Sequence, residues 1–97
     1  MAALADYTNV FDTALSAIKE KGYQIWYDQE SSTYYAEKNG WDFASNLPVG
    51  LLGVISIFEY QNPPSWKEYW WRRPDSGLYR NLPEAAPRSY APVYKRT

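Results

Sequence analysis

Apolar residues recur at helical spacing near the start of the chain, with charged and small polar residues between them. Their positions are Leu4, Tyr7, Phe11, Leu15 and Ile18. Intervals of three and four residues place these side chains on one face of a helix. We expect the helix to begin near Ala3, or at Thr8 if that residue caps it. It should end at Lys21-Gly22, where a basic side chain and a glycine suit a C-terminus.

After this helix the pattern changes to aromatic and β-branched residues interrupted by polar turns. Two strands are expected at residues 23–27 and 33–38, joined by a polar turn at 28–32. Asn39-Gly40 then predicts a two-residue type I′ turn, because both central positions of that turn need a positive φ. A third strand should follow at residues 41–45.

A two-residue turn determines which residues face each other across the hairpin. The expected pairs are Lys38 with Trp41, Glu37 with Asp42, Ala36 with Phe43, and Tyr35 with Ala44. Side chains alternate between the two faces of a strand, so the pairs divide into two sets. The face expected to line the core carries Tyr34, Ala36, Trp41 and Phe43. The opposite face carries Tyr35, Glu37 and Asp42.

Residues 49–60 are apolar on nearly every side and predict a second helix. Asn46 precedes Leu47-Pro48, which suggests an N-cap with a proline in the first turn, and Pro63-Pro64 should end the helix. The β-branched run at residues 54–58 leaves a strand as the alternative. A helix that is apolar all round is expected to be buried on two sides, by the sheet and by the C-terminal segment or a second subunit.

The expected fold is therefore α+β, a single domain with a three-stranded antiparallel meander packed on two helices. Residues 1–61 form this α-β-β-β-α body. The order of elements resembles that of double-stranded-RNA-binding domains. In that family, lysines near the start of the second helix contact phosphates. The matching stretch here, residues 46–50, has no basic residue, so the body is not expected to bind double-stranded RNA.

Residues 62–97 have a different composition from the body. They hold six of the seven prolines, all five arginines and seven aromatic residues. Such a segment is too rich in proline for regular secondary structure and too aromatic for an inert tail. We expect an extended strap that packs on the body and belongs to the same domain.

Charge is divided unevenly between these two parts. Residues 1–61 carry eight acids against three lysines, a net charge of −5, and residues 62–97 carry seven bases against three acids, a net charge of +4. The two parts are therefore expected to attract each other or partners of opposite sign.

The chain lacks the residues that most catalytic and metal sites use. It has no cysteine and no histidine, and it contains no Gly-rich phosphate loop. We therefore expect no enzyme, no cofactor and no metal site. Glu37 and Asp42 are the exception, since two opposed carboxylates can hold a hard cation, although a pair of surface charges is the simpler interpretation. The absence of a long apolar run favours a soluble cytoplasmic protein that does not enter a membrane.

Three functions are consistent with these features. The first is a small protein-binding inhibitor, similar to immunity proteins, antitoxins or phage inhibitors, that blocks the surface of a toxin or nuclease. Its expected contact residues are Tyr35, Glu37, Asp42, Asp28 and Glu30. The others are single-stranded nucleic-acid binding and a homodimer formed through the second helix.

The sequence Trp70-Trp71-Arg72-Arg73 interleaves aromatic and basic side chains. This pattern suits a strap that holds the body, an interface with a partner protein, and stacking on nucleic-acid bases. The strap is the preferred interpretation, and nucleic acid is the least favoured partner.

Overall fold

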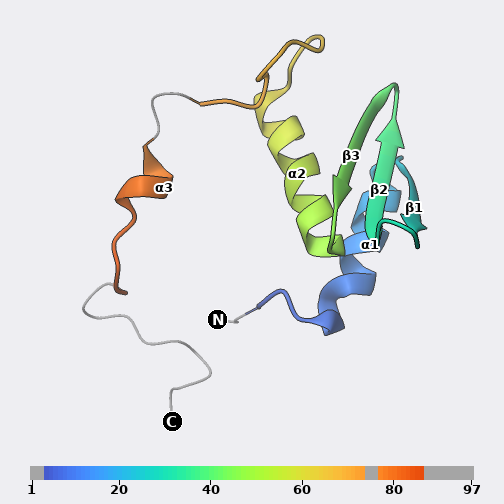
Figure 1. Ribbon diagram of the computed structural model, residues 1–97, viewed down its shortest axis with the longest axis horizontal. Helices are drawn as coiled ribbons and strands as arrows, with labels where there is room; N and C mark the ends of the chain where they lie inside the picture. Colours follow the sequence, from blue (N-terminus) through green and yellow to red (C-terminus); the bar gives the residue numbers. More distant parts are fainter. Residues whose placement is uncertain (1–3, 74–76, 87–97) are drawn as a thin grey trace. The chain divides into compact units, whose positions relative to one another are not determined.

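The computed structural model describes residues 4–73 and 77–86. Residues Asp6–Trp71 form one compact unit, which we call the body, and the described residues outside it belong to a second unit. The body's elements, in chain order, are η1 (Thr8–Val10), α1 (Phe11–Glu20), β1 (Gln24–Asp28), β2 (Thr33–Lys38), β3 (Trp41–Ser45) and α2 (Pro48–Gln61). Figure 1 shows this order. The predicted α-β-β-β-α fold is confirmed.

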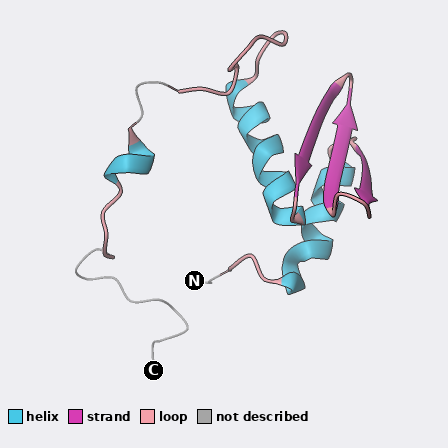
Figure 2. Ribbon diagram, in the orientation of Figure 1, coloured by secondary structure: helices cyan, strands magenta, loops and turns pink. Residues whose placement is uncertain are grey.

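The sheet of the body is antiparallel, with strand order β1-β2-β3. The hairpin register is the predicted one: Glu37 pairs with Asp42, and Ala36 pairs with Phe43. Asn39 and Gly40 have φ values of 53° and 83°, as a type I′ turn requires. Both helices pack on the same face of the sheet (Figure 2), α1 mainly on β1 and α2 mainly on β3.

The first helix begins later than its apolar spacing suggests. Leu4 and Tyr7 lie in coil with 85% and 71% of their surface exposed, and a single 3₁₀ turn precedes α1. The expectation of a helix from Ala3 is wrong, because the first two apolar side chains of the pattern are not buried and add nothing to helix stability. The predicted end is confirmed. Gly22 has a φ of 94°, and Lys38 Nζ donates a 2.6 Å hydrogen bond to the carbonyl of Lys21.

The hydrophobic core lies between the helices and the inner face of the sheet. Ile18 of α1 and Leu51 and Ile55 of α2 are fully buried, and burying each such side chain contributes about 1.5–3 kcal/mol. They meet the remaining core residues of the cluster, Tyr23, Ala36 and Phe43. Tyr34 and Trp41 pack at the margin of this cluster, as predicted from the hairpin register.

Residues 48–61 form a helix, which rules out the strand alternative. The N-cap is Leu47 and not Asn46, and its side chain makes no capping hydrogen bond. The Ser45 hydroxyl accepts the Leu47 N–H at 3.3 Å instead. At the other end, Asn62 adopts a left-handed conformation with φ 47°, which stops the helix before the two prolines.

The burial of α2 is less complete than its sequence suggests. Leu51 and Ile55 are fully buried on the side toward the sheet and α1, but Ile57 and Tyr60 keep 45% and 68% of their surface exposed. Gly50 and Gly53 are also exposed. Among the described residues, the side of α2 that was expected to be buried by the C-terminal segment or a second subunit is therefore only partly covered.

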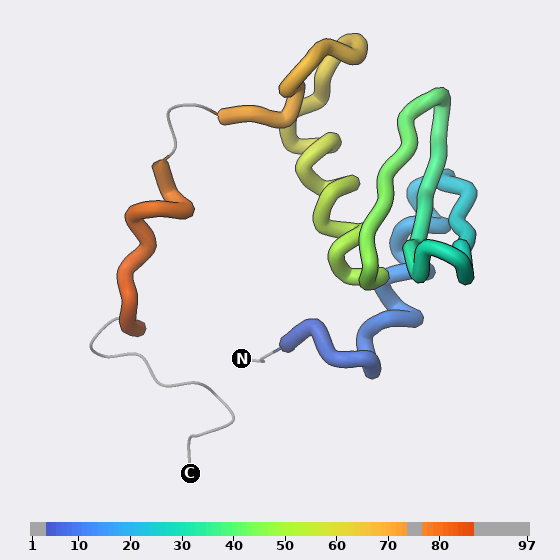
Figure 3. Tube along the Cα trace, in the orientation of Figure 1, coloured from blue at the N-terminus to red at the C-terminus, as the bar shows by residue number. Residues whose placement is uncertain are grey.

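The chain turns back after α2 and reaches the end of the body that carries the β2–β3 turn (Figure 3). Here the Trp70 ring lies edge-on to Trp41, with centroids 5.5 Å apart, and edge-on to Phe58 at 5.9 Å. The Gln61 side chain donates to the Trp70 carbonyl at 3.4 Å. The first ten residues of the C-terminal segment are thus part of the body.

The described part of the second unit contains one short helix, α3 (Leu78–Asn81), that the sequence pattern did not predict. Gly77 precedes it with φ 54°, and the Asn81 amide donates to the Gly77 carbonyl at 2.7 Å. Leu78 and Tyr79 are exposed. For residues 72–97 the strap remains a prediction. No helix in the described ranges is long and apolar enough to cross a membrane.

Candidate functional site

The face of the sheet that α1 and α2 leave uncovered is the candidate functional surface. We call it the outer face. It carries the alternate side chains Gln24, Trp26, Asp28, Thr33, Tyr35, Glu37, Asp42 and Ala44, according to the strand register. The sheet therefore gathers four of the five predicted body residues on one surface. The fifth, Glu30, is exposed in the turn that joins β1 to β2.

Two aromatic rings form the centre of the outer face. Trp26 and Tyr35 are paired across β1 and β2, and their rings stack with centroids 5.5 Å apart and planes 14° apart. Trp26 keeps 48% of its surface exposed. On the other side Tyr35 faces Ala44, whose small side chain leaves room beside the tyrosine ring. The stack is a preformed, nearly flat contact surface that needs little ordering before it binds.

The two opposed carboxylates lie next to this stack. Glu37 is half-buried, and its Oε2 accepts the Gly40 N–H of the hairpin turn at 2.9 Å. Asp42 is exposed. Lys38 is the nearest base along the chain, but its ammonium group lies on the inner side, bonded to Lys21 and placed over the Tyr23 ring. The register places no basic side chain on the outer face.

Asp28 ends β1 and holds the following turn. Its carboxylate accepts hydrogen bonds from the N–H, at 3.1 Å, and from the hydroxyl of Ser31. The Ser31 hydroxyl bond and then the backbone bond lower the pKa of Asp28 below its usual range, so this carboxylate is ionised at neutral pH. Asp28, Glu37 and Asp42 therefore make the outer face uniformly acidic.

Trp70 and Trp71, the predicted tail residues that belong to the body, do not lie on this surface. Trp70 is half-buried beside Trp41, which is an inner-face residue of β3, and Trp71 keeps 50% of its surface exposed. Arg72 and Arg73 are exposed and belong to the second unit. The predicted residues thus form one group on the outer face and another group along the chain from Trp70.

Trp26 is a surface residue that the sequence interpretation missed. The predicted five-residue turn at 28–32 would pair Trp26 with Tyr34 and direct the Trp26 ring toward the core. The structure instead pairs Asp28 with Thr33 across a four-residue turn. A change of one residue in register moves every side chain of the strand to the opposite face. The signal was Asp28 followed by Ser31, since an Asp side chain often bonds the backbone of the turn it begins.

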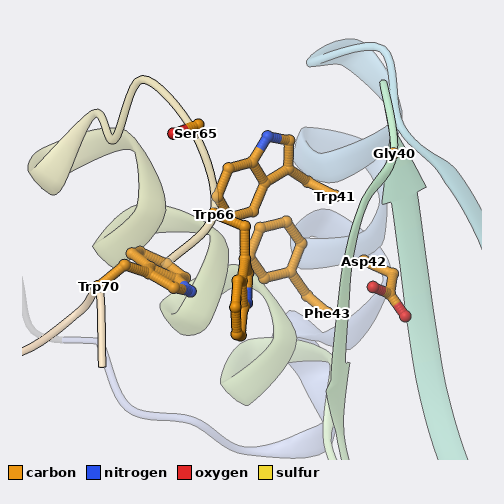
Figure 4. A pocket seen from close by; sticks show the side chains of 7 residues that line it. All are labelled: Gly40, Trp41, Asp42, Phe43, Ser65, Trp66 and Trp70. Atoms are coloured by element: carbon orange, nitrogen blue, oxygen red, sulfur yellow. The ribbon is translucent and has the colours of Figure 1, made fainter. Parts of the chain in front are cut away.

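No metal-ligand cluster accompanies the acidic pair in the part of the chain that the structure describes. The described ranges contain no cluster of three or more acidic side chains able to hold a metal ion. Figure 4 shows the Asp42 carboxylate pointing to the opposite side of β3 from the Trp41 and Phe43 rings. The arrangement is therefore suited to binding by charge and aromatic contact.

Comparison of the chain with models of known protein families, with curated proteins and with solved structures finds no match in any of the three. The function therefore has to be inferred from the chemistry of the surface.

Proposed function

We propose that this protein binds another protein through its outer face and inhibits it by covering a basic functional surface. The observation that carries this proposal is the Trp26–Tyr35 ring stack flanked by Glu37, Asp42 and Asp28 on the sheet face opposite α1 and α2. A basic nuclease or a toxin that acts on nucleic acid is the partner class that fits this chemistry.

The aromatic centre supports a protein partner because tryptophan and tyrosine dominate the energetic hot spots of protein interfaces. A ring pair already stacked in the free protein loses little side-chain entropy when a partner covers it. Its acidic surround selects basic partners and speeds their approach. Covering an exposed, partly aromatic sheet face also lowers the free energy, because it removes apolar surface from water.

The experiment that tests this function is affinity purification with the full chain, followed by quantitative binding to the protein recovered. Trp26→Ala is expected to weaken binding by about 30-fold, which corresponds to about 2 kcal/mol for a central aromatic contact. Glu37→Lys and Asp42→Lys should each weaken it at least about tenfold. For these two charge reversals at low salt, most of the loss of affinity should come from a slower association rate.

Glu20→Lys is the matched control, because it changes the net charge by the same amount on an exposed position of α1. It should leave binding within about twofold if the effect is local to the outer face. Circular dichroism and thermal unfolding of each variant show whether the fold persists. The proposal is wrong if purification recovers no partner, or if both charge reversals leave binding unchanged.

Single-stranded nucleic-acid binding is a second candidate that one observation favours. Trp66 and Trp71 keep 70% and 50% of their surface exposed on either side of the basic residue Lys67 and the acidic residue Glu68. Exposed rings can stack on bases. Binding to a single-stranded oligonucleotide at about 50 mM salt, falling steeply as salt rises, is the expected result for this function. Its absence at that salt concentration excludes the candidate.

A homodimer through α2 is supported only by the partial exposure of Ile57 and Tyr60. The mass of the full chain by light scattering tests it directly. A mass of about 11.3 kDa, that of one chain, excludes a stable dimer at the concentration measured.

A further inference from the structure

Two hollows adjoin each other at the end of the body where the chain turns back, and Asp42 is the one lining residue that they share with the outer face. The first, of about 340 Å³, is lined by Gly40, Trp41, Asp42, Phe43, Ser65, Trp66 and Trp70. The second, of about 320 Å³, is lined by Phe43, Val54, Ile57, Trp70 and Trp71. Phe43 and Trp70 line both hollows. Together the two form a groove with an aromatic ridge across its middle, entirely within the body.

The ridge of this groove is held in place. Trp70 packs edge-on against Trp41 and Phe58, and Gln61 bonds its carbonyl. The outer walls are exposed tryptophans, Trp66 on the first hollow and Trp71 on the second. Figure 4 shows the Trp66 ring extending beside Phe43 and Trp41. Large exposed rings on a fixed support leave apolar surface uncovered, which is a feature of binding grooves.

The polar groups of the groove limit the class of ligand. The indole N–H groups of Trp66 and Trp70 donate no hydrogen bond within the described part of the chain, whereas the Asp42 carboxylate lies on the other side of β3. The side chains of the groove thus offer indole donors, rings and the Ser65 hydroxyl. A quaternary ammonium ligand needs a carboxylate or a closed cage of rings, and a sugar needs many polar partners, so neither class fits this groove well.

We propose that this groove binds a proline-rich segment of a partner protein in the polyproline II conformation. Prolines three residues apart lie about 9 Å apart along such a helix, and in the proposed complex successive prolines occupy the hollows on either side of Trp70. The backbone carbonyls of the segment make no internal hydrogen bonds and supply acceptors for the indole N–H groups. Proline brings no N–H that needs an acceptor from the groove.

Charge adds a preference for basic flanking residues in the ligand. The body, residues 6–71, carries nine acidic and four basic side chains. Lys67 and Glu68, between Trp66 and Trp70, carry opposite charges, so the preference comes from the net charge of the body rather than from a group in the groove. A proline-rich segment with flanking arginine or lysine is therefore attracted at long range.

The test uses the full chain and a panel of synthetic ten-residue peptides, each with prolines three residues apart and arginine at both ends. Control peptides carry alanine in place of every proline. Binding is followed through the backbone and indole N–H signals of ¹⁵N-labelled protein. The expected result is saturable binding tighter than about 1 mM, with shifts of the Trp66 and Trp70 indole signals, no shift for Trp26, and at least tenfold weaker binding of the alanine peptides.

Trp66→Ala is the decisive variant, because this ring is 70% exposed and its loss should leave the fold intact. It should weaken peptide binding at least tenfold, while Trp26→Ala, on the outer face, should leave it unchanged. For the partner proposed for the outer face the roles are exchanged: Trp26→Ala should weaken binding, and Trp66→Ala should leave it unchanged. Each proposal can therefore fail without the other. The groove proposal is overturned if no proline peptide binds, if alanine peptides bind equally well, or if only an oligonucleotide shifts the Trp66 signal.

Discussion

Glu37 and Asp42 face each other directly across the β2–β3 hairpin, and the backbone N–H of Gly40 donates a 2.9 Å hydrogen bond to the Glu37 carboxylate. Like charges in directly opposed positions of a sheet are destabilising. The turn N–H offsets part of this cost by stabilising the negative charge on Glu37. The pair therefore persists at some cost to stability, which is consistent with the binding role proposed for the outer face.

Replacing Asp42 by lysine should stabilise the protein even though it impairs the proposed binding. The substitution converts a repulsive cross-strand pair into an attractive one, and the free energy of unfolding should rise by about 0.5–1 kcal/mol. Urea unfolding at low salt measures this change, and about 0.5 M salt should reduce it. Asp42→Asn should show a smaller increase. A loss of stability in Asp42→Lys at low salt contradicts the prediction.

The two glycines of α2 should respond differently to alanine. A Cβ at Gly53 meets nothing nearby, so Gly53→Ala should raise the free energy of unfolding by about 0.5–1 kcal/mol through helix propensity alone. A Cβ at Gly50 collides with the Ser45 hydroxyl, which accepts the Leu47 N–H at the helix start. Gly50→Ala should therefore gain less or lose stability. Thermal unfolding of both variants side by side tests the difference, and equal gains contradict it.

Trp70 and Trp66 should differ in their contribution to stability despite their proximity. Trp70→Ala removes ring contacts with Trp41 and Phe58 and should lower the free energy of unfolding by about 2 kcal/mol, less than for a fully buried tryptophan. Trp66→Ala should change it by less than about 0.5 kcal/mol, since the ring is mostly exposed. Chemical unfolding followed by circular dichroism compares them. Equal losses would falsify the assignment of Trp70 as the anchor.

Tyr23 should make the protein sensitive to alkaline pH. Burial, and then the negative charge of Glu59, raise the pKa of Tyr23 above its ordinary value of 10.0. The folded state favours the neutral phenol, so this contribution is fully present below about pH 10 and is lost as pH rises through the folded pKa. Tyr23→Phe keeps the ring contact with Phe43 and removes the titrating group.

The measurement for Tyr23 is the free energy of unfolding between about pH 8 and pH 11 for the wild type and Tyr23→Phe. The gap between the two proteins should move in favour of the phenylalanine variant above about pH 10. Other tyrosines titrate in both proteins and cancel in the comparison. A gap that does not change with pH contradicts the prediction.

Local signals in the sequence were sufficient for the β2–β3 hairpin. Asn39-Gly40 has the backbone freedom that a type I′ turn requires, and a two-residue turn leaves only one register. From that register follow the core positions of Ala36 and Phe43 and the outward positions of Tyr35, Glu37 and Asp42. The order of the other elements follows from apolar periodicity and turn signals. Residues 49–60 are apolar on nearly every side, and the proline at their start favoured a helix without excluding a strand.

Other features depended on contacts that the local pattern does not contain. Leu4 and Tyr7 continue the helical spacing, but without burial the spacing does not extend α1. The face on which Trp26 lies depended on a difference of one residue in the length of the turn between β1 and β2. The hydrogen bonds between Asp28 and Ser31 set that length. Trp66, Trp70 and Trp71 are chemically alike, yet Trp70 anchors and the other two stay exposed.

The sequence alone therefore determined the α-β-β-β-α order, the β2–β3 hairpin and the acidic, aromatic character of the body, because these depend on periodicity, turn chemistry and composition. The tertiary structure decided which rings are joined on which surface: Trp26 with Tyr35 on the outer face, and Trp70 with Trp41 and Phe58 at the groove. The physical reason is that exposure of a ring depends on long-range packing. The same residue type contributes to the core or to a binding surface according to what the rest of the chain places against it.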